Sequence, residues 1–204
     1  VYTRAEVQRL AKKGFELAMT RSKKLCCVDK ANVLETSRLW RETVQAMAKD
    51  YPEVEVSYEF VDAVAMRLVQ WPNSYDVLIT ENLFGDILTD EASVISGSMG
   101  LMPSASVGEH TSLYEPIHGS YPQATGLNIA NPLATILSAA MMFEDAFGLK
   151  EEAQAIRTVV NKSLEEGVVT EDLAAKGSKA YKTSEVGDWL VRSEEHTSEL
   201  QSQR

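Results

Sequence analysis

Hydrophobic and polar positions change their spacing several times along the chain. Apolar residues recur at helical spacing over residues 4–21, and a short apolar run from Lys24 to Val28 then predicts a buried strand. The same succession continues, with helices predicted over residues 37–50, 63–71 and from about 86, and strands over residues 54–60 and 75–80. Because parallel strands need connections of about a dozen residues or more, this alternation predicts an α/β fold with a mainly parallel sheet and flanking helices.

The pattern changes near Gly97, where glycines and prolines punctuate a loop-rich stretch that lasts to Pro132. Pro132 then opens an apolar helix that runs to about Phe147. Two further helices are predicted, over residues 151–166 and 184–191. We therefore expect one domain over residues 1–96 and another over residues 97–191.

The last residues have a different character. The segment RSEEHTSELQS begins at Arg192, lacks a hydrophobic periodicity, and resembles the conceptual translation of a common DNA sequencing adapter. We expect residues 192–204 to be an adapter-derived artefact and assign no function to them. The alternative is a natural polar tail.

Composition narrows the class of protein. A chain of 204 residues with 44% hydrophobic and 25% charged residues is typical of a globular protein with a sizeable core. Its 20 basic and 30 acidic residues argue against a broad nucleic-acid or anionic-membrane surface. No apolar stretch reaches roughly 18 residues, so we expect no membrane span. The adjacent Cys26 and Cys27 form no disulfide framework, which favours burial and a cytoplasmic location.

Four charged residues follow the predicted strands. Lys30 follows the first strand, Asp62 the second, and Asp86 and Asp90 the third. Ligands gather beyond the carboxyl ends of parallel strands, so this argument alone places all four in one site of a single chain. Three carboxylates would suit a hard cation such as Mg²⁺ or Mn²⁺, and a lysine beside cations can serve as a general base.

Each of these residues also has a purely structural interpretation. Asp86 would complement a helix dipole, Asp90 would be a solvated surface charge, and Lys30 would form an ordinary surface salt bridge. At the level of function, the aspartates would equally suit a Mg²⁺-dependent phosphohydrolase. A non-catalytic dimerisation module is the third alternative.

A second candidate region spans residues 113–132. Its glycines allow close backbone approach, His118 offers a flat imidazole, and Asn131 precedes a helix that Pro132 opens. Such a loop can wrap a nucleotide, although a histidine between prolines can also be structural. The chain has no GxGxxG after a strand and no GxxxxGK[ST], so neither the usual Rossmann turn nor a P-loop is present.

Four motifs occur in one order along the chain. They are VDKANVL from Val28, NLFGDILTDEAS from Asn82, GLMPSAS from Gly100, and EPIHGSYPQATGLNIANP from Glu115. With them the sequence resembles the β-decarboxylating dehydrogenases, the family of isocitrate, homoisocitrate, tartrate and 3-isopropylmalate dehydrogenases, from about residue 2 to 191. The GLMPSAS wording favours the isopropylmalate branch.

The resemblance implies a metal site and a catalytic base. It makes Asp62, Asp86 and Asp90 the ligands of Mg²⁺ or Mn²⁺ and Lys30 the catalytic lysine, with Lys30 and Asp62 also binding substrate. In this family the counterparts of Lys30 and Asp62 act in the active site of the neighbouring subunit. The resemblance therefore implies a homodimer with shared sites, in place of the single-chain site that the strand ends alone indicate.

The implied reaction is the NAD-dependent oxidative decarboxylation of (2R,3S)-3-isopropylmalate to 2-oxoisocaproate in leucine biosynthesis. Isocitrate, homoisocitrate or tartrate oxidation is the alternative within the family. The substrate class is a small 2-hydroxy dicarboxylate, and neither nucleic acid nor membrane is expected as a partner.

The resemblance also gives residues 1–96 dimerisation, metal and catalytic roles, and makes residues 97–191 the carboxyl-terminal part of a nucleotide-binding domain. The cofactor loop that it implies there is formed by His118, Gly119, Ser120, Gln123 and Asn131. His118 is expected beside the adenine and Asn131 near its edge. Gln123 stands where NAD-using relatives commonly carry an aspartate, and the Lys-Tyr pair of NADP-using isocitrate dehydrogenases is absent. A neutral amide can bond a ribose hydroxyl but offers no positive charge to a 2′-phosphate, so NAD is the expected cofactor.

Members of the family are longer at the amino end. The additional part is expected to hold the first strands, the arginines that bind the substrate carboxylates and the tyrosine that protonates the product. The 204-residue chain alone is therefore expected to show no dehydrogenase turnover. The residues that separate the substrates of the family are expected in that part as well.

Overall fold

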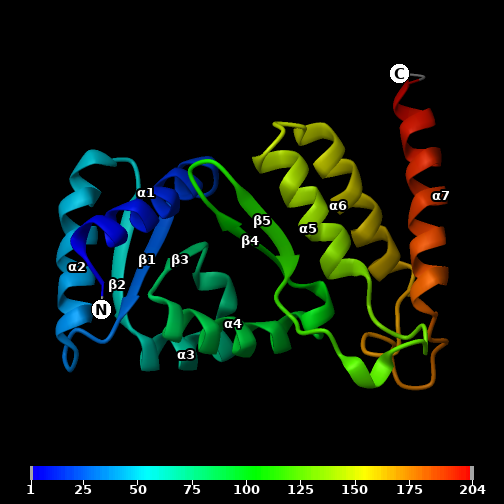
Figure 1. The fold of residues 1–204 in the computed structure, drawn as a ribbon, viewed down its shortest axis with the longest axis horizontal. Coiled ribbons are helices and arrows are strands. Elements are labelled where there is room, and N and C mark those ends of the chain that lie inside the picture. The colour runs from blue at the N-terminus through cyan, green and yellow to red at the C-terminus, as the bar shows by residue number, and fades with distance from the viewer. Residues whose placement is uncertain (1, 203–204) are drawn as a thin grey trace. The chain divides into compact units, whose positions relative to one another are not determined.

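The structure is a computed structural model that describes residues 2–202, with side chains described as far as Ser193 (Figure 1). It divides into two compact units, one ending at Ala92 and the other beginning at Ser93. The first unit holds a parallel sheet with helices on both faces, which confirms the predicted α/β class.

Every helix and strand predicted before residue 97 is present, with bounds shifted by a few residues. In chain order the elements are α1 (Arg4–Thr20), β1 (Lys24–Asp29), α2 (Glu35–Met47), η1 (Ala48–Asp50), β2 (Glu55–Phe60), α3 (Val61–Gln70), η2 (Pro72–Ser74), β3 (Val77–Ile79) and α4 (Asn82–Ser96). The first helix begins with a capping box, in which the Thr3 hydroxyl and the Glu6 carboxylate each bond the other's backbone amide.

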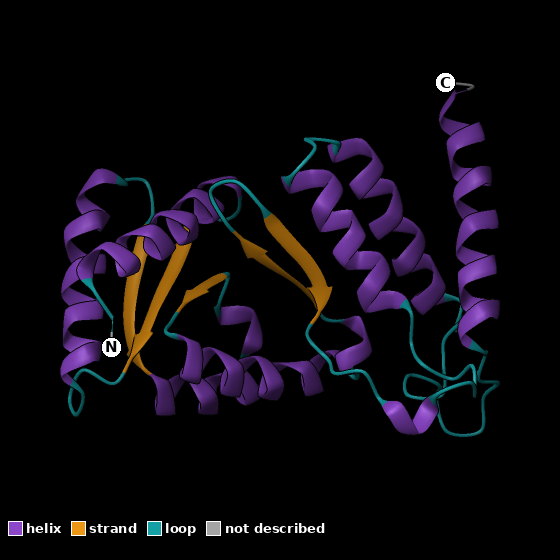
Figure 2. Cartoon of the chain, viewed as in Figure 1, coloured by secondary structure: helices purple, strands orange, loops and turns teal. Residues whose placement is uncertain are grey.

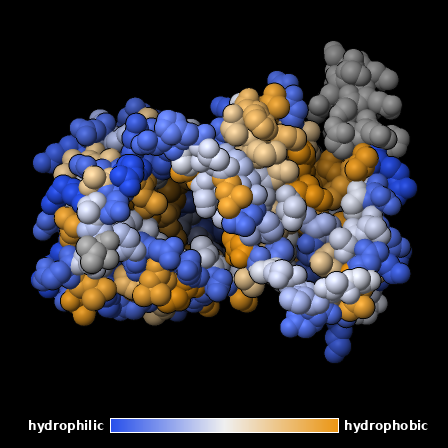
Figure 3. All heavy atoms as spheres, viewed as in Figure 1, coloured by the Kyte–Doolittle hydropathy of each residue, from blue (hydrophilic) through white to orange (hydrophobic). Residues whose placement is uncertain are grey.

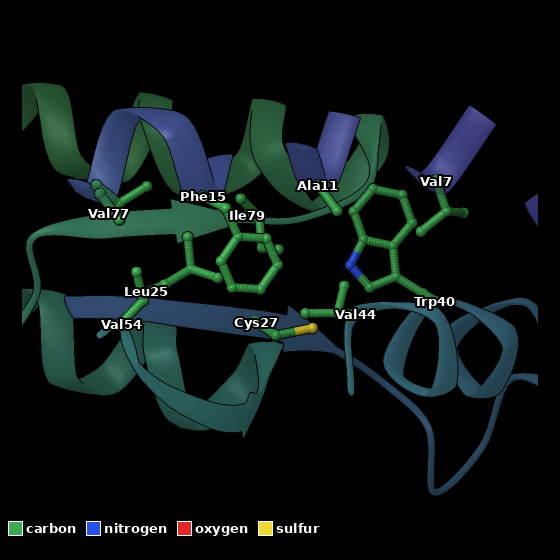
Figure 4. Packing of buried hydrophobic residues seen from close by; sticks show 11 residues of the cluster. Val7, Ala11, Phe15, Leu25, Cys27, Trp40, Val44, Val54, Val77 and Ile79 are labelled. Atoms are coloured by element: carbon green, nitrogen blue, oxygen red, sulfur yellow. The ribbon is translucent and has the colours of Figure 1, made fainter. Parts of the chain in front are cut away.

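The sheet of the first unit has the strand order β2-β1-β3, and all its strands are parallel. Alternate residues of the central strand face opposite sides. Leu25 and Cys27 belong to the core under α1 and α2, and Cys26 and Val28 to the core under α3 and α4. Figure 4 shows Phe15 of α1 and Trp40 of α2 in the first of these cores.

The two cysteines are therefore buried on opposite faces of one strand, and both are free thiols, which agrees with the predicted structural burial. Burial raises the pKa of the Cys26 thiol to about 11 and raises that of the Cys27 thiol further. Neither residue forms a reactive thiolate near neutral pH.

The helix that carries Asp86 begins four residues earlier than expected, at Asn82. The cause is Glu81, whose carboxylate accepts hydrogen bonds from the backbone amides of Leu83 and Phe84, each at 3.2 Å. These bonds satisfy two of the amides that the first turn of a helix leaves unpaired. Glutamate is not a preferred N-cap residue, so the local sequence carried only a weak signal for this helix start.

The second unit contains a hairpin that the sequence pattern does not predict (Figure 2). Strands β4 (Pro103–Val107) and β5 (Ser112–Pro116) pair antiparallel, from Pro103 opposite Pro116 to Val107 opposite Ser112. The two prolines lie at one end of the ladder, where a missing backbone amide is tolerated. Because prolines are typical of loops, the sequence pattern predicted a loop here. Two short helices, η3 (Met99–Leu101) and η4 (Pro122–Ala124), flank the hairpin in sequence.

Three helices complete the second unit: α5 (Leu133–Asp145), α6 (Lys150–Glu165) and α7 (Thr183–Ser202). Their shared core is formed by Leu133, Val159, Val160, Val186 and Leu190. The last helix continues past residue 191, where we expected it to end, because the segment that follows contains no glycine or proline to stop it. No helix within the described residues is long and apolar enough to cross a membrane.

Candidate active site

Lys30 and Asp62 meet at the carboxyl end of the parallel sheet. Asp29 ends β1 and lies in register with Phe60, the last residue of β2, so the residues that follow the two strands emerge side by side. The Lys30 Nζ donates a hydrogen bond to Asp62 Oδ1 at 2.5 Å. This bond is the main reason why the pKa of the Asp62 carboxyl lies below its ordinary value. The structure thus brings together the two residues assigned to catalysis and substrate.

A buried ion pair supports the loop that carries Lys30. The Asp29 side chain is only 1% exposed, and its carboxylate accepts two hydrogen bonds from the Arg41 guanidinium, at 2.7 and 3.0 Å. It also accepts the backbone amide of Ala31 at 2.8 Å, which ties down the turn around Lys30. The Phe60 ring lies 5.1 Å from Arg41 Cζ and 5.5 Å from Lys30 Nζ.

Sequence reasoning missed Asp29 and Arg41. The available signal was an aspartate inside a run of buried residues, because such a charge requires a partner. The sequence did not show which cation supplies it.

Asp86 and Asp90 lie one turn apart on α4, and both are exposed. Asp62 belongs to α3, which follows β2, whereas α4 follows β3, and β1 lies between these two strands. The strand ends are therefore separated by about 10 Å, two strand spacings. Within the described residues there is no group of three or more His, Cys, Asp or Glu side chains that could hold a metal ion.

The single-chain metal site that the strand ends alone indicate is accordingly not formed. The donor chemistry of the three aspartates still fits Mg²⁺ or Mn²⁺, since all three supply carboxylate oxygens. Their division between two subunits stays a prediction.

The second unit contains a cavity of about 630 Å³ beside the predicted cofactor loop. Of the residues assigned to the cofactor, it is lined by His118, Gly119, Ser120 and Asn131, but not by Gln123, which lies on the exposed η4. Its other lining residues are Gly100, Tyr121, Ile129, Ala130, Glu171 and Asp172. A volume of this size falls in the range of small-molecule and cofactor sites.

Asn131 is tightly packed in this cavity wall. A Cβ atom built on Gly100 would lie 2.6 Å from the Asn131 Cβ, so only glycine at position 100 leaves room for the asparagine. The Asn131 Oδ1 accepts the backbone amide of Leu133 at 3.0 Å, at the start of α5. The nearby His118 Nδ1 lies 2.9 Å from the Gly119 carbonyl oxygen.

Asp172 is a further residue of the cavity that sequence reasoning missed. Its carboxylate accepts hydrogen bonds from the side chains of Ser98, Thr170 and Asn131. Burial, the largest single influence, raises the pKa of this carboxyl, but the hydrogen bonds together outweigh it and the net shift is downward. No local motif marked Asp172, because its partners lie as far as 74 positions away in sequence.

A parallel sheet with flanking helices and a cavity of cofactor size are consistent with a cofactor-binding enzyme of the α/β class. The profile of the isocitrate/isopropylmalate dehydrogenase family matches residues 1–190, and the chain belongs to this family. The match ends before residues 192–204, the segment with the adapter-like sequence.

Two similar curated proteins are 3-isopropylmalate dehydrogenases. The chain is 59% identical over 191 residues to a 3-isopropylmalate dehydrogenase of Bacteroides fragilis, and 56% identical over 190 residues to one of Desulfitobacterium hafniense. The alignments cover 94% and 93% of this chain and 54% of each relative. The chain thus spans about half the length of the curated relatives it matches.

Solved structures of the family have the same fold. An isocitrate dehydrogenase from Methylococcus capsulatus matches with a TM-score of 0.88 and 38% identity, over 94% of this chain and 57% of that one. A β-decarboxylating dehydrogenase from Thermococcus kodakarensis matches with a TM-score of 0.86 and 37% identity, over 96% of this chain and 57% of that one.

Proposed function

We propose that the chain supplies a catalytic lysine, metal-binding carboxylates and a nucleotide cavity to an NAD-dependent 3-isopropylmalate dehydrogenase. The reaction is the oxidative decarboxylation of (2R,3S)-3-isopropylmalate to 2-oxoisocaproate, a step of leucine biosynthesis. The observation that carries the proposal is the 2.5 Å contact between Lys30 and Asp62 at adjacent strand ends. The names of the curated relatives support the choice of substrate.

Lys30 is the proton acceptor in this proposal. Its Nζ, as the neutral amine, takes the proton of the substrate hydroxyl, directly or through water. NAD, when bound, would accept the hydride from the carbon that bears this hydroxyl. Loss of the β-carboxylate as CO₂ then leaves an enolate, which needs one proton from the part of the enzyme outside this chain to give 2-oxoisocaproate. Asp62, hydrogen-bonded to Lys30, orients the amine. The buried Asp29–Arg41 pair holds the turn from which Lys30 extends.

Asp62, Asp86 and Asp90 are the residues that would hold Mg²⁺ or Mn²⁺. When bound, the ion supplies positive charge beside the oxygen of the alcohol that is oxidised. The carboxylates hold such a hard cation with oxygen donors, and no cysteine or histidine competes in the described part of α3 and α4.

The proposal includes a homodimer in which Lys30 and Asp62 of one chain join Asp86 and Asp90 of the partner subunit. Apolar side chains on the two aspartate-bearing helices support it. Met66 and Val69 of α3 and Leu83 and Ile87 of α4 are all exposed. Figure 3 shows orange patches on the surface over the region where α3 and α4 lie in Figure 1. Burying these side chains against a second copy would remove apolar surface from water next to the aspartates.

NAD is the proposed cofactor and the cytoplasm the proposed location. The residues that line the cavity include no lysine or arginine for a 2′-phosphate, and Gln123 adds no charge to the cofactor loop. Two buried free thiols suit a reducing compartment.

A chimeric protein tests the proposal. The portion of the Bacteroides fragilis relative that this chain does not span would be joined to residues 1–191 of this chain, and NADH formation measured with 3-isopropylmalate and Mn²⁺. We expect turnover, and we expect Lys30→Met to lower kcat by roughly 10²–10⁴-fold, the range of general-base contributions.

Lys12→Met is the matched control, because Lys12 is an exposed lysine of α1 that pairs with Glu16 of the same helix. It should leave kcat unchanged. A chimera that folds but forms no NADH, or a Lys30→Met variant with full activity, would contradict the proposal.

The substrate needs its own comparison, because the solved structure with 38% identity is an isocitrate dehydrogenase. Isocitrate is thus the second candidate. In the same chimera, kcat/KM for 3-isopropylmalate should exceed that for isocitrate. The reverse order would reject 3-isopropylmalate while leaving the family reaction in place.

A further inference from the structure

Asp172 connects three segments of the second unit that are distant in sequence. The Ser98 hydroxyl and the Asn131 Nδ2 both donate to Asp172 Oδ2, the latter at 2.9 Å, and the Thr170 hydroxyl donates to Oδ1 at 2.5 Å. Ser98 in turn accepts the backbone amide of Gly100 at 2.9 Å. Asp172 therefore ties together two other segments that line the cavity, at Gly100 and Asn131.

This network determines the orientation of the Asn131 amide. A carboxylate only accepts hydrogen bonds and a backbone amide only donates one. The Asn131 Nδ2 donates to Asp172, and the Asn131 Oδ1 accepts the Leu133 amide. Rotating the side-chain amide by half a turn would place Oδ1 against the Asp172 carboxylate and Nδ2 against the Leu133 amide, so both hydrogen bonds would be lost. Only one orientation satisfies both neighbours.

The anchored amide retains further hydrogen-bonding capacity. Its Nδ2 has a second hydrogen and its Oδ1 a second lone pair, because each atom uses one of two in the network. An adjacent donor and acceptor match an adenine edge, which presents an amino group next to a ring nitrogen. The close fit of Asn131 against Gly100 further restricts its side chain.

We propose that Asp172 is a positioning residue of the nucleotide cavity, whose carboxylate holds the Asn131 amide in the one orientation that pairs with an adenine. The inference rests on the proposed function, since it assumes that the cavity binds NAD. It assigns a role to Asp172, which lies outside the sequence motifs, and it explains why this residue lines the nucleotide cavity.

The first test measures NADH binding to the 204-residue chain by the change in NADH fluorescence. Asp172→Asn keeps the shape but replaces one acceptor oxygen with an amino group, and it should weaken NADH binding by about tenfold or more, as expected for a lost hydrogen bond to a charged group. Asp188→Asn is the matched control, because it makes the same substitution at an exposed aspartate of α7 that does not line the cavity. Its affinity should stay within about twofold of the unchanged chain.

The second test separates positioning from a general structural effect. In an Asn131→Ala background, Asp172→Asn should cause no further loss of NADH affinity, because the residue through which it acts is gone. Binding of reduced nicotinamide mononucleotide, which lacks adenine, should be unaffected by Asp172→Asn alone. If Asp172 had only a general structural role, Asp172→Asn would lower NADH affinity further in the Asn131→Ala background. It would also weaken the binding of reduced nicotinamide mononucleotide.

A measurement on the unchanged chain keeps the inference testable if Asp172→Asn fails to fold. The NMR signals of the Asn131 side-chain amide should move when acid protonates Asp172. A static signal, or Asp172→Asn binding NADH normally, would overturn the inference but leave the proposed function intact. An unchanged chain that unfolds cooperatively yet binds no NADH would contradict the nucleotide cavity itself, and with it the inference.

Discussion

Asp29 shows how much the site depends on one buried charge. A carboxylate that is 1% exposed is stable in the folded chain only with partners, and Arg41 and the Ala31 amide supply three hydrogen bonds to it. The charge lies next to Lys30 in sequence, so the same contacts that satisfy the carboxylate fix the turn that carries this lysine. The Asp29–Arg41 pair thus links the stability of the first unit to its chemistry.

Arg41→Leu should therefore destabilise the first unit by about 3–5 kcal/mol, the cost of leaving a buried charge without its partner. Urea unfolding monitored by fluorescence measures the change. Lys13→Leu is the control, because Lys13 and Glu16 form an exposed pair at 3.4 Å. It should cost less than about 1 kcal/mol. Equal losses in the two variants would show that burial of Asp29 does not set the cost.

Tyr75 gives a prediction for alkaline pH. Burial and the hydrogen bond from its hydroxyl to Glu59 raise the pKa of Tyr75 to about 12, above the ordinary value of 10.0. The folded state then holds this proton more tightly than the unfolded state. The resulting stabilisation is complete below about pH 10 and is lost as the pH rises toward 12.

Tyr75→Phe should accordingly reduce the loss of stability between about pH 10 and pH 12, as measured by urea unfolding at several pH values. Tyr121→Phe, at an exposed position of the second unit, should leave the alkaline loss unchanged. If Tyr75→Phe lost stability over this pH range as steeply as the unchanged chain, Tyr75 would not be the source of the alkaline loss.

Among the elements, α1 and the sheet illustrate what local patterns predict well. The helical spacing of its apolar residues located α1 to within a residue at its end, and alternation located β2. Such patterns record which side of an element is buried. They did not predict the β4–β5 hairpin or the start of α4, since prolines bound the hairpin and a glutamate caps the helix. The hairpin and the start of α4 both depend on contacts that secondary-structure propensities describe poorly.

The contact between α1 and β3 can be tested through a glycine. A Cβ on Gly14 would lie 2.3 Å from Ile79 Cγ2, so Gly14→Ala should destabilise the first unit by about 1–3 kcal/mol despite the better helix propensity of alanine. Gly187→Ala in α7 meets no described atom within 4 Å and should stabilise by roughly 0.5–1 kcal/mol. Thermal unfolding distinguishes the two signs, and a stabilising Gly14→Ala would contradict the close approach.

For the molecule as a whole, the three aspartates assigned to the metal do not form one group within the described part of a single chain. The order β2-β1-β3 keeps Asp62 apart from Asp86 and Asp90, and no three-residue metal group occurs within the described part of one chain. The proposed dimer would join them. It would also cover the exposed side chains of α3 and α4.

Val69→Lys tests this arrangement in the chimera. Val69 is exposed on α3, two turns beyond Asp62, so a lysine there should weaken dimerisation by about tenfold or more without removing a ligand. Mn²⁺ affinity, measured by electron paramagnetic resonance, should fall in parallel with the dimer fraction seen in sedimentation. Leu17→Lys on α1 is the control and should change neither. A monomer that binds Mn²⁺ normally would exclude a shared site.

The sequence by itself determined the family and the α/β order of the first unit, and it supplied the residues proposed for catalysis, because each rests on local motifs and spacing. Only the tertiary structure decided which of these residues meet. It joined Lys30 to Asp62 and kept Asp62 apart from Asp86 and Asp90. It also brought Asp172 into hydrogen-bond contact with Asn131, 41 positions away. The physical reason is that periodicity encodes which face of an element is buried, whereas a hydrogen bond between distant residues forms only after several elements have packed.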